Sequence, residues 1–176
     1  LLLDEGVEKT RIDRAALAFG MPMGPVALAD QVGLDICLEV ARSLSEGVTQ
    51  PVADLPGWLR EKVEKGETGK KAGKGLYDYG TETPPETAGD ADEDPALTDR
   101  LILPMCNAAV ECLREGVVAD ADSLDAALIF GTGWAPFRGG PLHFARIRGD
   151  VPKALRELAE RHGARFTPDP GWDNLA

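Results

Sequence analysis

The chain has 176 residues, of which 43% are apolar, and its formal net charge is -11. This length and apolar content suffice for one sizeable hydrophobic core or two small ones. The acidic balance argues against a nucleic acid or an anionic membrane as partner, because either needs a basic protein face. No window approaches the roughly 18 apolar residues of a membrane span, so we expect no span and a cytoplasmic location.

Three cysteines, Cys37, Cys106 and Cys112, lie within apolar helical patterns. An odd number in such positions is typical of reduced, buried thiols and not of a disulfide framework. The spacing of Cys106 and Cys112 fits no common zinc motif, and only His143 and His162 could add imidazole ligands. We therefore predict that the chain has no metal site.

The first half of the sequence predicts four helices punctuated by glycine and proline. Residues 11–19 carry apolar side chains at helical spacing, and a second helix runs from Pro25 to a cap at Gly33. A third, over residues 34–44, is the clearest amphipathic helix, and a short one covers residues 58–64. The apolar positions of the third helix are Ile36, Cys37, Val40, Ala41 and Leu44.

Residues 69–79 combine three glycines with Lys70, Lys71 and Lys74. Such a loop can approach a phosphate through backbone amides and ammonium groups, or it can be a solvated turn. Its spacing differs from that of a P-loop, whose lysine follows the final glycine and precedes Ser or Thr. Residues 80–94 have no large apolar side chain and many carboxylates, which predicts an extended linker.

A long helix then begins at Asp94 and Pro95 and ends at Gly116, with a core stripe along one face. Asn107 lies near that stripe, as a buried amide that bonds backbone or as a ligand contact. The stripe consists of Leu97, Leu101, Ile102, Met105, Ala109 and Cys112. Further helices are predicted over residues 123–130, 142–147 and 151–162.

The first of these later helices should begin at Asp122 or Ser123, and the last should be capped by Asp150 and Gly163. His143 has no acidic neighbour in sequence, so we expect it to be a surface or structural histidine. The tail is irregular, and we expect Phe166 and Trp172 to attach it to the body. No alternating apolar run is long enough for a sheet, so the sequence predicts an all-α protein.

Two glycine–proline corners, residues 20–25 and 133–141, each follow an Asp-containing helix. Glycine permits positive φ and proline fixes φ, so each corner should be rigid. The repeated order predicts two similar helical-bundle repeats related by duplication, with a first repeat, a linker and a second repeat. Their bounds are 1–80, 81–94 and 95–176. Each corner is either a packed turn or a wall for a long apolar ligand.

The chain opens without methionine, at residues 1–6, in a pattern typical of the last turn of a helix. In the second half the matching residues 112–116 close a long helix. We therefore expect at least one further turn before Leu1 and interpret the chain as part of a longer protein.

Residues 12–25, 30–35 and 69–77 together resemble the C-terminal domain of 3-hydroxyacyl-CoA dehydrogenases. Residues 107–118 and 136–141 look like the extra helical repeat of the multifunctional fatty-acid oxidation proteins, of the α-subunit or trifunctional type. The resemblance covers nearly the whole chain. It implies a β-oxidation enzyme that oxidises 3-hydroxyacyl-CoA with NAD.

The resemblance also implies that the catalytic residues lie elsewhere. In the family a preceding dinucleotide-binding domain binds most of the NAD and supplies a histidine base paired with a glutamate. This sequence has no strand-Gly-x-Gly-x-x-Gly-helix unit, and neither His143 nor His162 has a matching context, so we assign no catalytic residue. A family asparagine near the active site would fall before Leu1, and Asp99-Arg100 stands at the corresponding place of the second copy.

Some contacts are implied residue by residue. Lys71 matches the second lysine of the family's Gly-Lys-Lys-Thr-Gly and is implied to reach the cofactor, although Ala72 replaces the threonine. Phe130 stands where some relatives have a tyrosine near the substrate. The residues implied to line the acyl-pantetheine side are Met21, Pro22, Met23 and Gly24.

The main hypothesis is therefore the C-terminal helical part of a 3-hydroxyacyl-CoA dehydrogenase, inactive alone. It would line the acyl-CoA cleft and make subunit contacts, in a homodimer or with a thiolase subunit. The alternative is a stand-alone helical dimerisation or interaction module without catalysis. A small acyl-CoA carrier would need a phosphate-binding cluster beyond Lys70, Lys71 and Lys74, and none is present in the sequence.

Overall fold

The computed structural model describes residues 1–47, 55–89 and 94–175. These residues form helices and loops, with two isolated β-bridges and no strand among them, so the predicted all-α class is confirmed. The chain divides into two compact units. Unit 1 comprises Leu1–Ala18 and Met23–Glu93, and unit 2 comprises Phe19–Pro22 and Asp94–Ala176.

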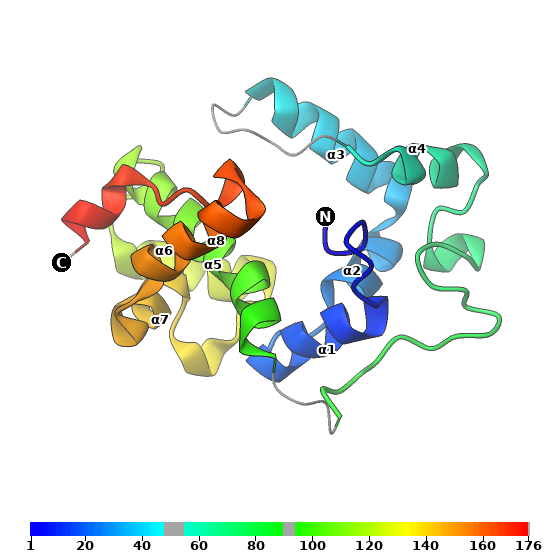
Figure 1. The fold of residues 1–176 in the computed structure, drawn as a ribbon, viewed down its shortest axis with the longest axis horizontal. Coiled ribbons are helices and arrows are strands. Elements are labelled where there is room, and N and C mark those ends of the chain that lie inside the picture. Colours follow the sequence, from blue (N-terminus) through cyan, green and yellow to red (C-terminus); the bar gives the residue numbers. More distant parts are fainter. Residues whose placement is uncertain (48–54, 90–93, 176) are drawn as a thin grey trace. The chain divides into compact units, whose positions relative to one another are not determined.

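Unit 1 contains the four predicted helices and a short 3-10 turn (Figure 1). Its elements are α1 (Lys9–Phe19), α2 (Pro25–Val32), α3 (Leu34–Gly47), α4 (Gly57–Glu64) and η1 (Lys70–Ala72). The predicted bounds of α2 are confirmed: Pro25 occupies its first turn, and Gly33 closes it with φ near 111°. By contrast, α1 begins two residues before the predicted start at residue 11, and α3 continues three residues beyond the predicted end at residue 44. In α1 the four predicted apolar positions are buried, as Ile12, Ala15, Ala16 and Phe19.

The face of α3 differs from the prediction. Leu34 and Leu38 are buried against Leu59 of α4, whereas Ile36 and Val40 are half exposed. Both sets satisfy helical spacing, and packing against α2 and α4 decides which set is inside. The free thiol of Cys37 is partly buried beside them, and burial raises its pKa.

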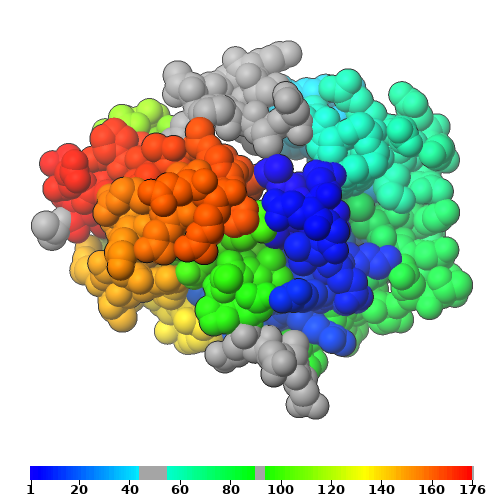
Figure 2. Space-filling model, viewed as in Figure 1, coloured from blue at the N-terminus to red at the C-terminus, as the bar shows by residue number. Residues whose placement is uncertain are grey.

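Unit 2 is built around the long helix α5 (Pro95–Arg114). This helix packs against α6, α7, α8, η3 and η4. The surrounding elements are α6 (Ala121–Thr132), η2 (Pro136–Arg138), α7 (Pro141–Arg148), α8 (Val151–His162), η3 (Ala164–Phe166) and η4 (Pro170–Asn174). In Figure 2, α8 and the segment after it form part of the surface of unit 2. Trp134, Cys106 and Leu103 lie fully buried in its core.

Helix caps in unit 2 follow the sequence in part. The Asp94 carboxylate accepts a hydrogen bond from the Leu97 amide, as predicted for the start of α5. For α6 the predicted cap, Asp122 or Ser123, is wrong: Asp120 accepts from the Ser123 amide, two or three residues earlier than expected. Asp150 precedes α8 but caps no amide, because its carboxylate pairs with Arg148 at 2.7 Å.

A buried carboxylate caps the helix that follows each glycine–proline corner. In unit 1 the Asp13 carboxylate accepts hydrogen bonds from the amides of Val26 (2.7 Å) and Ala27 (3.0 Å) at the start of α2. In unit 2 the Asp125 carboxylate accepts from the amides of Leu142 (2.8 Å) and His143 (2.9 Å) at the start of α7. These four hydrogen bonds satisfy amides that have no partner within their own helix, and the two carboxylates complement the helix dipoles.

The tail of unit 2 is attached by a polar cluster and by apolar contacts. Asn107 donates to the Thr167 carbonyl (2.9 Å) and accepts from the Asp169 amide and the Trp172 indole, both at 2.8 Å. The expected backbone role of this asparagine is thus confirmed. Arg114 makes a bidentate ion pair with the buried Asp169, at 2.8 and 2.9 Å. Phe166 is buried and Trp172 packs on the core, as predicted.

No helix among the described residues combines the length and apolar character needed to span a bilayer. Cys106 is buried and Cys112 partly buried, and both are free thiols. Burial raises the pKa of Cys106 to about 12, so this thiol stays protonated at neutral pH.

Replacing Gly24 with alanine should destabilise unit 1 by about 1–3 kcal/mol, the usual cost of overpacking. An added Cβ would lie 2.2 Å from the Asp13 side chain and would push the carboxylate off the amides that it caps. Gly57→Ala is the matched control, because Gly57 also lies at the start of a helix and has no neighbour within 4 Å. Urea unfolding of both variants checks this; equal midpoints would contradict it.

Asp169 should make unit 2 less stable at acid pH. Its hydrogen bonds with Arg114 hold the pKa of this carboxyl below the usual value. The folded state therefore binds the proton more weakly than the unfolded chain, whose pKa is about 3.9. The stabilisation is present above that value and is lost as pH falls through the folded pKa. Urea unfolding from neutral to acid pH should show this loss, and Asp169→Asn should reduce it, whereas Asp173→Asn, at an exposed neighbour, should not.

Candidate functional site

The lysine-containing loop of residues 69–79 is anchored on one buried side chain of α2. The Asp30 carboxylate accepts from the amides of Leu76 and Tyr77, both at 2.8 Å. Gly69 and Gly75 pack directly on Asp30, where an added Cβ would lie 2.3 Å and 2.2 Å away. Gly69 has φ near 123°, so glycine serves both the close approach and the backbone conformation here.

Tyr77 connects this loop to α1. Its side chain is buried, and its hydroxyl donates to the Asp13 carboxylate at 2.9 Å. Burial raises the pKa of Asp13, and burial together with the Asp13 hydrogen bond raises that of Tyr77, so the phenol stays a donor. Lys9 lies over the Tyr77 ring, with its ammonium 4.6 Å from the centroid, and donates to the Leu76 carbonyl.

The lysines of the loop have different surroundings. Lys74 pairs with Glu67 at 2.8 Å, and Lys62 pairs with the same carboxylate at 3.0 Å. These two ammonium groups lower the pKa of Glu67 to about 2. Lys70 and Lys71 lie on η1, are exposed, and form no ion pair with the described carboxylates. The ammonium group of Lys71 is therefore accessible to an anionic group.

The first corner carries the candidate substrate residues in different environments. Met21 is partly buried and packs on the core of unit 2, and Pro22 is exposed beside Gly133. Met23 is 39% exposed, whereas Gly24 is buried against Asp13. Of the four, only Pro22 and Met23 thus present an exposed side chain.

Phe130 lies on α6 and is 90% exposed, the largest exposure of any large apolar side chain described. It belongs to unit 2, with Met21 and Pro22, whereas Lys71, Met23 and Gly24 belong to unit 1. The described residues contain no group of three or more His, Cys, Asp or Glu side chains arranged to hold a metal ion. His143 is exposed at the start of α7, and its amide is capped by Asp125.

The corner and the anchored loop lie within one stretch of sequence with known relatives. Residues 1–79 match the family model of the 3-hydroxyacyl-CoA dehydrogenase, C-terminal domain. The predicted resemblance is confirmed for these residues, which include Lys71 and the whole Asp13–Asp30–Tyr77 network. Phe130 and the other residues after position 79 lie outside the match.

Over most of its length the chain is also similar to fatty acid oxidation complex α subunits. It is 32% identical to that of Shewanella sp. (strain W3-18-1) over 182 residues, which is 95% of this chain and 26% of the relative. The identity to the Idiomarina loihiensis protein is 32% over 187 residues, 97% of this chain and 26% of the relative. The chain thus spans about a quarter of the length of the curated relatives that it matches.

Two solved structures share the fold. The 3-hydroxybutyryl-CoA dehydrogenase of Escherichia coli K12 aligns with a TM-score of 0.79 and 20% identity, over 99% of this chain and 56% of that chain. The dehydrogenase part of a Caenorhabditis elegans multifunctional enzyme aligns with a TM-score of 0.64 and 21% identity, over 94% of this chain and 41% of that chain.

Sequence reasoning alone did not single out Asp13, Asp30 and Tyr77 as a network. Asp13 and Asp30 each interrupt an apolar helix face at a position that turns inward, which was the available signal. Their partners lie up to 64 residues away in sequence, and only the fold shows them.

Tyr77→Phe should destabilise unit 1 by about 1–3 kcal/mol, because it leaves the buried Asp13 carboxylate with one donor fewer. The effect should shrink when Asp13 is already replaced by asparagine, since both changes affect one hydrogen bond. Urea unfolding of the two single variants and the double variant measures this coupling. Additive losses would contradict a direct interaction.

Proposed function

We propose that this chain is the C-terminal helical part of an NAD-dependent 3-hydroxyacyl-CoA dehydrogenase of fatty acid β-oxidation. The observation that carries the proposal is the family match of residues 1–79, which spans both the corner and the anchored lysine loop. The similarity of nearly the whole chain to fatty acid oxidation complex α subunits supports a multifunctional, cytoplasmic enzyme of this type.

Within such an enzyme the chain would bind and position, and residues outside it would carry out the chemistry. The described residues bring together no histidine with a buried carboxylate as a base: His143 is exposed, and the Asp125 carboxylate caps its amide. General-base catalysis needs such a group within hydrogen-bond reach of the substrate. The isolated chain is therefore inactive under this proposal.

Lys71 is the residue that would contact the cofactor. Its ammonium is exposed and has no carboxylate partner among the described residues, and its loop is held by the Asp30 hydrogen bonds. A fixed backbone with an unpaired cation suits a phosphate group of NAD. When bound, NAD supplies the hydride acceptor. Lys71 would orient it, and Asp30 would keep Lys71 in place.

The acyl-CoA would lie along the first corner. Met23 offers an exposed thioether, which adapts to apolar chains of different length, and Pro22 gives a rigid exposed edge. Gly24 and Met21 are at least partly buried. Gly24 would therefore shape the backbone of the corner, and Met21 would support the corner by packing on the core. Phe130, with its exposed ring on α6, would supply an apolar contact without the hydroxyl that a tyrosine would add.

We also propose that the two units arose by duplication, with the first repeat at 1–80, a linker at 81–94 and the second repeat at 95–176. The support is the repeated cap: an aspartate in one helix binds the two amides that follow the corner, at Asp13 and again at Asp125. The glycine before each capped helix, Gly24 or Gly140, packs on that aspartate in the same way.

One observation favours the alternative of a dimerisation or interaction module without catalysis. Leu28, Val32, Ile36 and Val40 are each between 47% and 51% exposed and recur every four residues along α2 and α3. Leu28 and Val32 share one face of α2, Ile36 and Val40 share one face of α3, and exposed apolar groups of this kind are typical of a protein contact surface. Under the main proposal the same surface would carry subunit contacts, in a homodimer or with a thiolase subunit.

A chimera tests the main proposal and Lys71 together. The chain replaces the corresponding segment of the Shewanella α subunit, and oxidation of NADH by acetoacetyl-CoA is measured for the chimera and for the isolated chain. We expect activity only in the chimera. There Lys71→Gln should raise the KM for NADH by about fivefold, since one exposed ion pair contributes up to about 1 kcal/mol.

Lys70→Gln is the matched control, because it removes the same charge from the neighbouring exposed residue and should leave this KM unchanged. Turnover by the isolated chain at the rate of the chimera would overturn the proposal. A folded but inactive chimera that still self-associates would favour the interaction module.

A further inference from the structure

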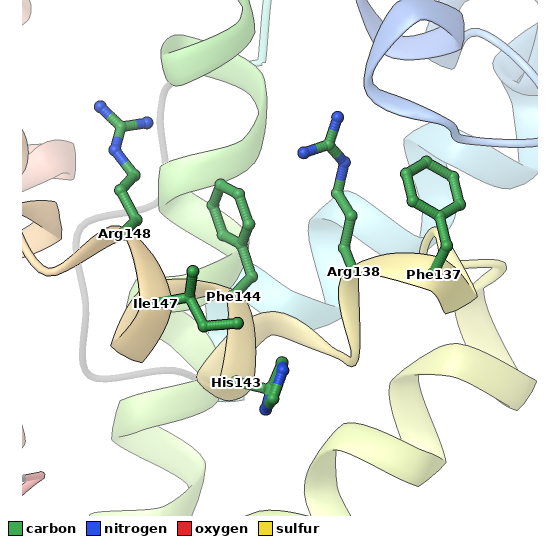
Figure 3. A pocket seen from close by; sticks show the side chains of 6 residues that line it. All are labelled: Phe137, Arg138, His143, Phe144, Ile147 and Arg148. Atoms are coloured by element: carbon green, nitrogen blue, oxygen red, sulfur yellow. The ribbon is translucent and has the colours of Figure 1, made fainter.

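Unit 2 contains an open pocket that the proposed dehydrogenase role does not use. Its volume is about 420 Å³, within the range of small-molecule sites. Figure 3 shows its six lining residues on η2 and α7, with the Phe144 ring between two arginine side chains. These residues are Phe137, Arg138, His143, Phe144, Ile147 and Arg148.

Arg138 is held in a fixed orientation by contacts that leave its charge unpaired. Its Nε donates to the Phe19 carbonyl at 2.6 Å, and its guanidinium lies 4.1 Å from the centroid of the Phe19 ring. It also lies over Phe137 (5.2 Å) and Phe144 (5.8 Å). No described carboxylate forms an ion pair with it. A guanidinium oriented in advance loses little entropy when it binds an anion.

The second arginine of the pocket is already neutralised. Arg148 forms a bidentate ion pair with Asp99 and a further one with Asp150 at 2.7 Å. Of the two arginines that line the pocket, only Arg138 therefore lacks an ion pair with a described carboxylate. One planar fork with a single charge suits a planar monoanion such as a carboxylate, whereas a phosphate dianion would meet the field of Asp99 and Asp150.

The walls around this charge are apolar and open to solvent. Phe137 is 75% exposed and Ile147 is 73% exposed. The Phe144 ring packs edge-on against Phe19 and Trp134, with ring centroids 5.3 and 5.9 Å away. Apolar surface left in water beside an unpaired cation favours a ligand that covers both at once.

We propose that this pocket binds a small carboxylate with an unbranched apolar body, of the class of medium-chain fatty acids. The carboxylate would pair with the terminal nitrogens of Arg138, and the chain would cover Phe137, Phe144 and Ile147. The site lies outside the residues that match the family model, so it does not depend on the proposed dehydrogenase function.

Titration of the isotope-labelled 176-residue chain with decanoate, followed by amide NMR shifts and by calorimetry, tests the proposal. Decanol is the matched probe, because it has the same chain without the negative charge. We expect decanoate to bind about tenfold more tightly, as for one charge-assisted hydrogen-bonded pair, with shifts centred on residues 137–148. Equal affinity for the two probes, or shifts centred elsewhere, would overturn the site.

Three variants locate the binding. Arg138→Gln should lower decanoate affinity to that of decanol. Arg146→Gln removes the same charge from an exposed position of α7 that does not line the pocket, and affinity should not change. Because Arg138 also contacts Phe19, Ile147→Ser provides a test at an exposed side chain that the fold does not need. This change should weaken the binding of both probes by about threefold, because apolar contact is lost. Unchanged binding in Ile147→Ser would contradict the proposal.

Discussion

A carboxylate buried at the start of a helix is the interaction on which each unit depends. Asp13 and Asp125 are both shielded from water, and each accepts two backbone amides from the helix after a glycine–proline corner. An unpaired buried carboxylate is costly, so the charge must find donors. The corner brings these donors within reach, and the charge in turn holds the corner. Glycine at the cap follows from this geometry, because a side chain would occupy the place of the carboxylate.

In unit 1 the Asp13 carboxylate makes a further hydrogen bond beyond the helix cap. Tyr77 donates to Asp13, and the backbone beside Tyr77 donates to Asp30, so α1, α2 and the lysine loop share one hydrogen-bonded network. The candidate cofactor contact at Lys71 is thus borne on a loop whose position is set from the core. Lysine side chains are flexible, and in this loop the hydrogen bonds fix the backbone that carries them.

The helices could be predicted well from sequence, because glycine, proline and apolar spacing act locally. The end of α1 and both limits of α2 followed from Gly20, Pro25 and Gly33 in this way. Which face of α3 is buried could not be predicted, since Ile36 and Leu38 both fit a helical stripe and only the position of α4 decides. Lys71 could be named as a candidate contact from sequence alone, because its motif is continuous. The contacts of Asp30 and Tyr77 could not be predicted, because their partners are distant in sequence. The pocket could not be predicted either, because it combines residues of η2 and α7.

The tail of unit 2 has a consequence for how the protein is made. Asn107 on the central helix completes its hydrogen bonds with residues 60 to 65 positions later, the last of them at Trp172. Until the ribosome has released that stretch, the nascent α5 carries an amide that must stay hydrated beside apolar surface. Unit 2 therefore reaches its native core only at the end of translation of these residues, whereas the Asp13 and Tyr77 network of unit 1 can close well before.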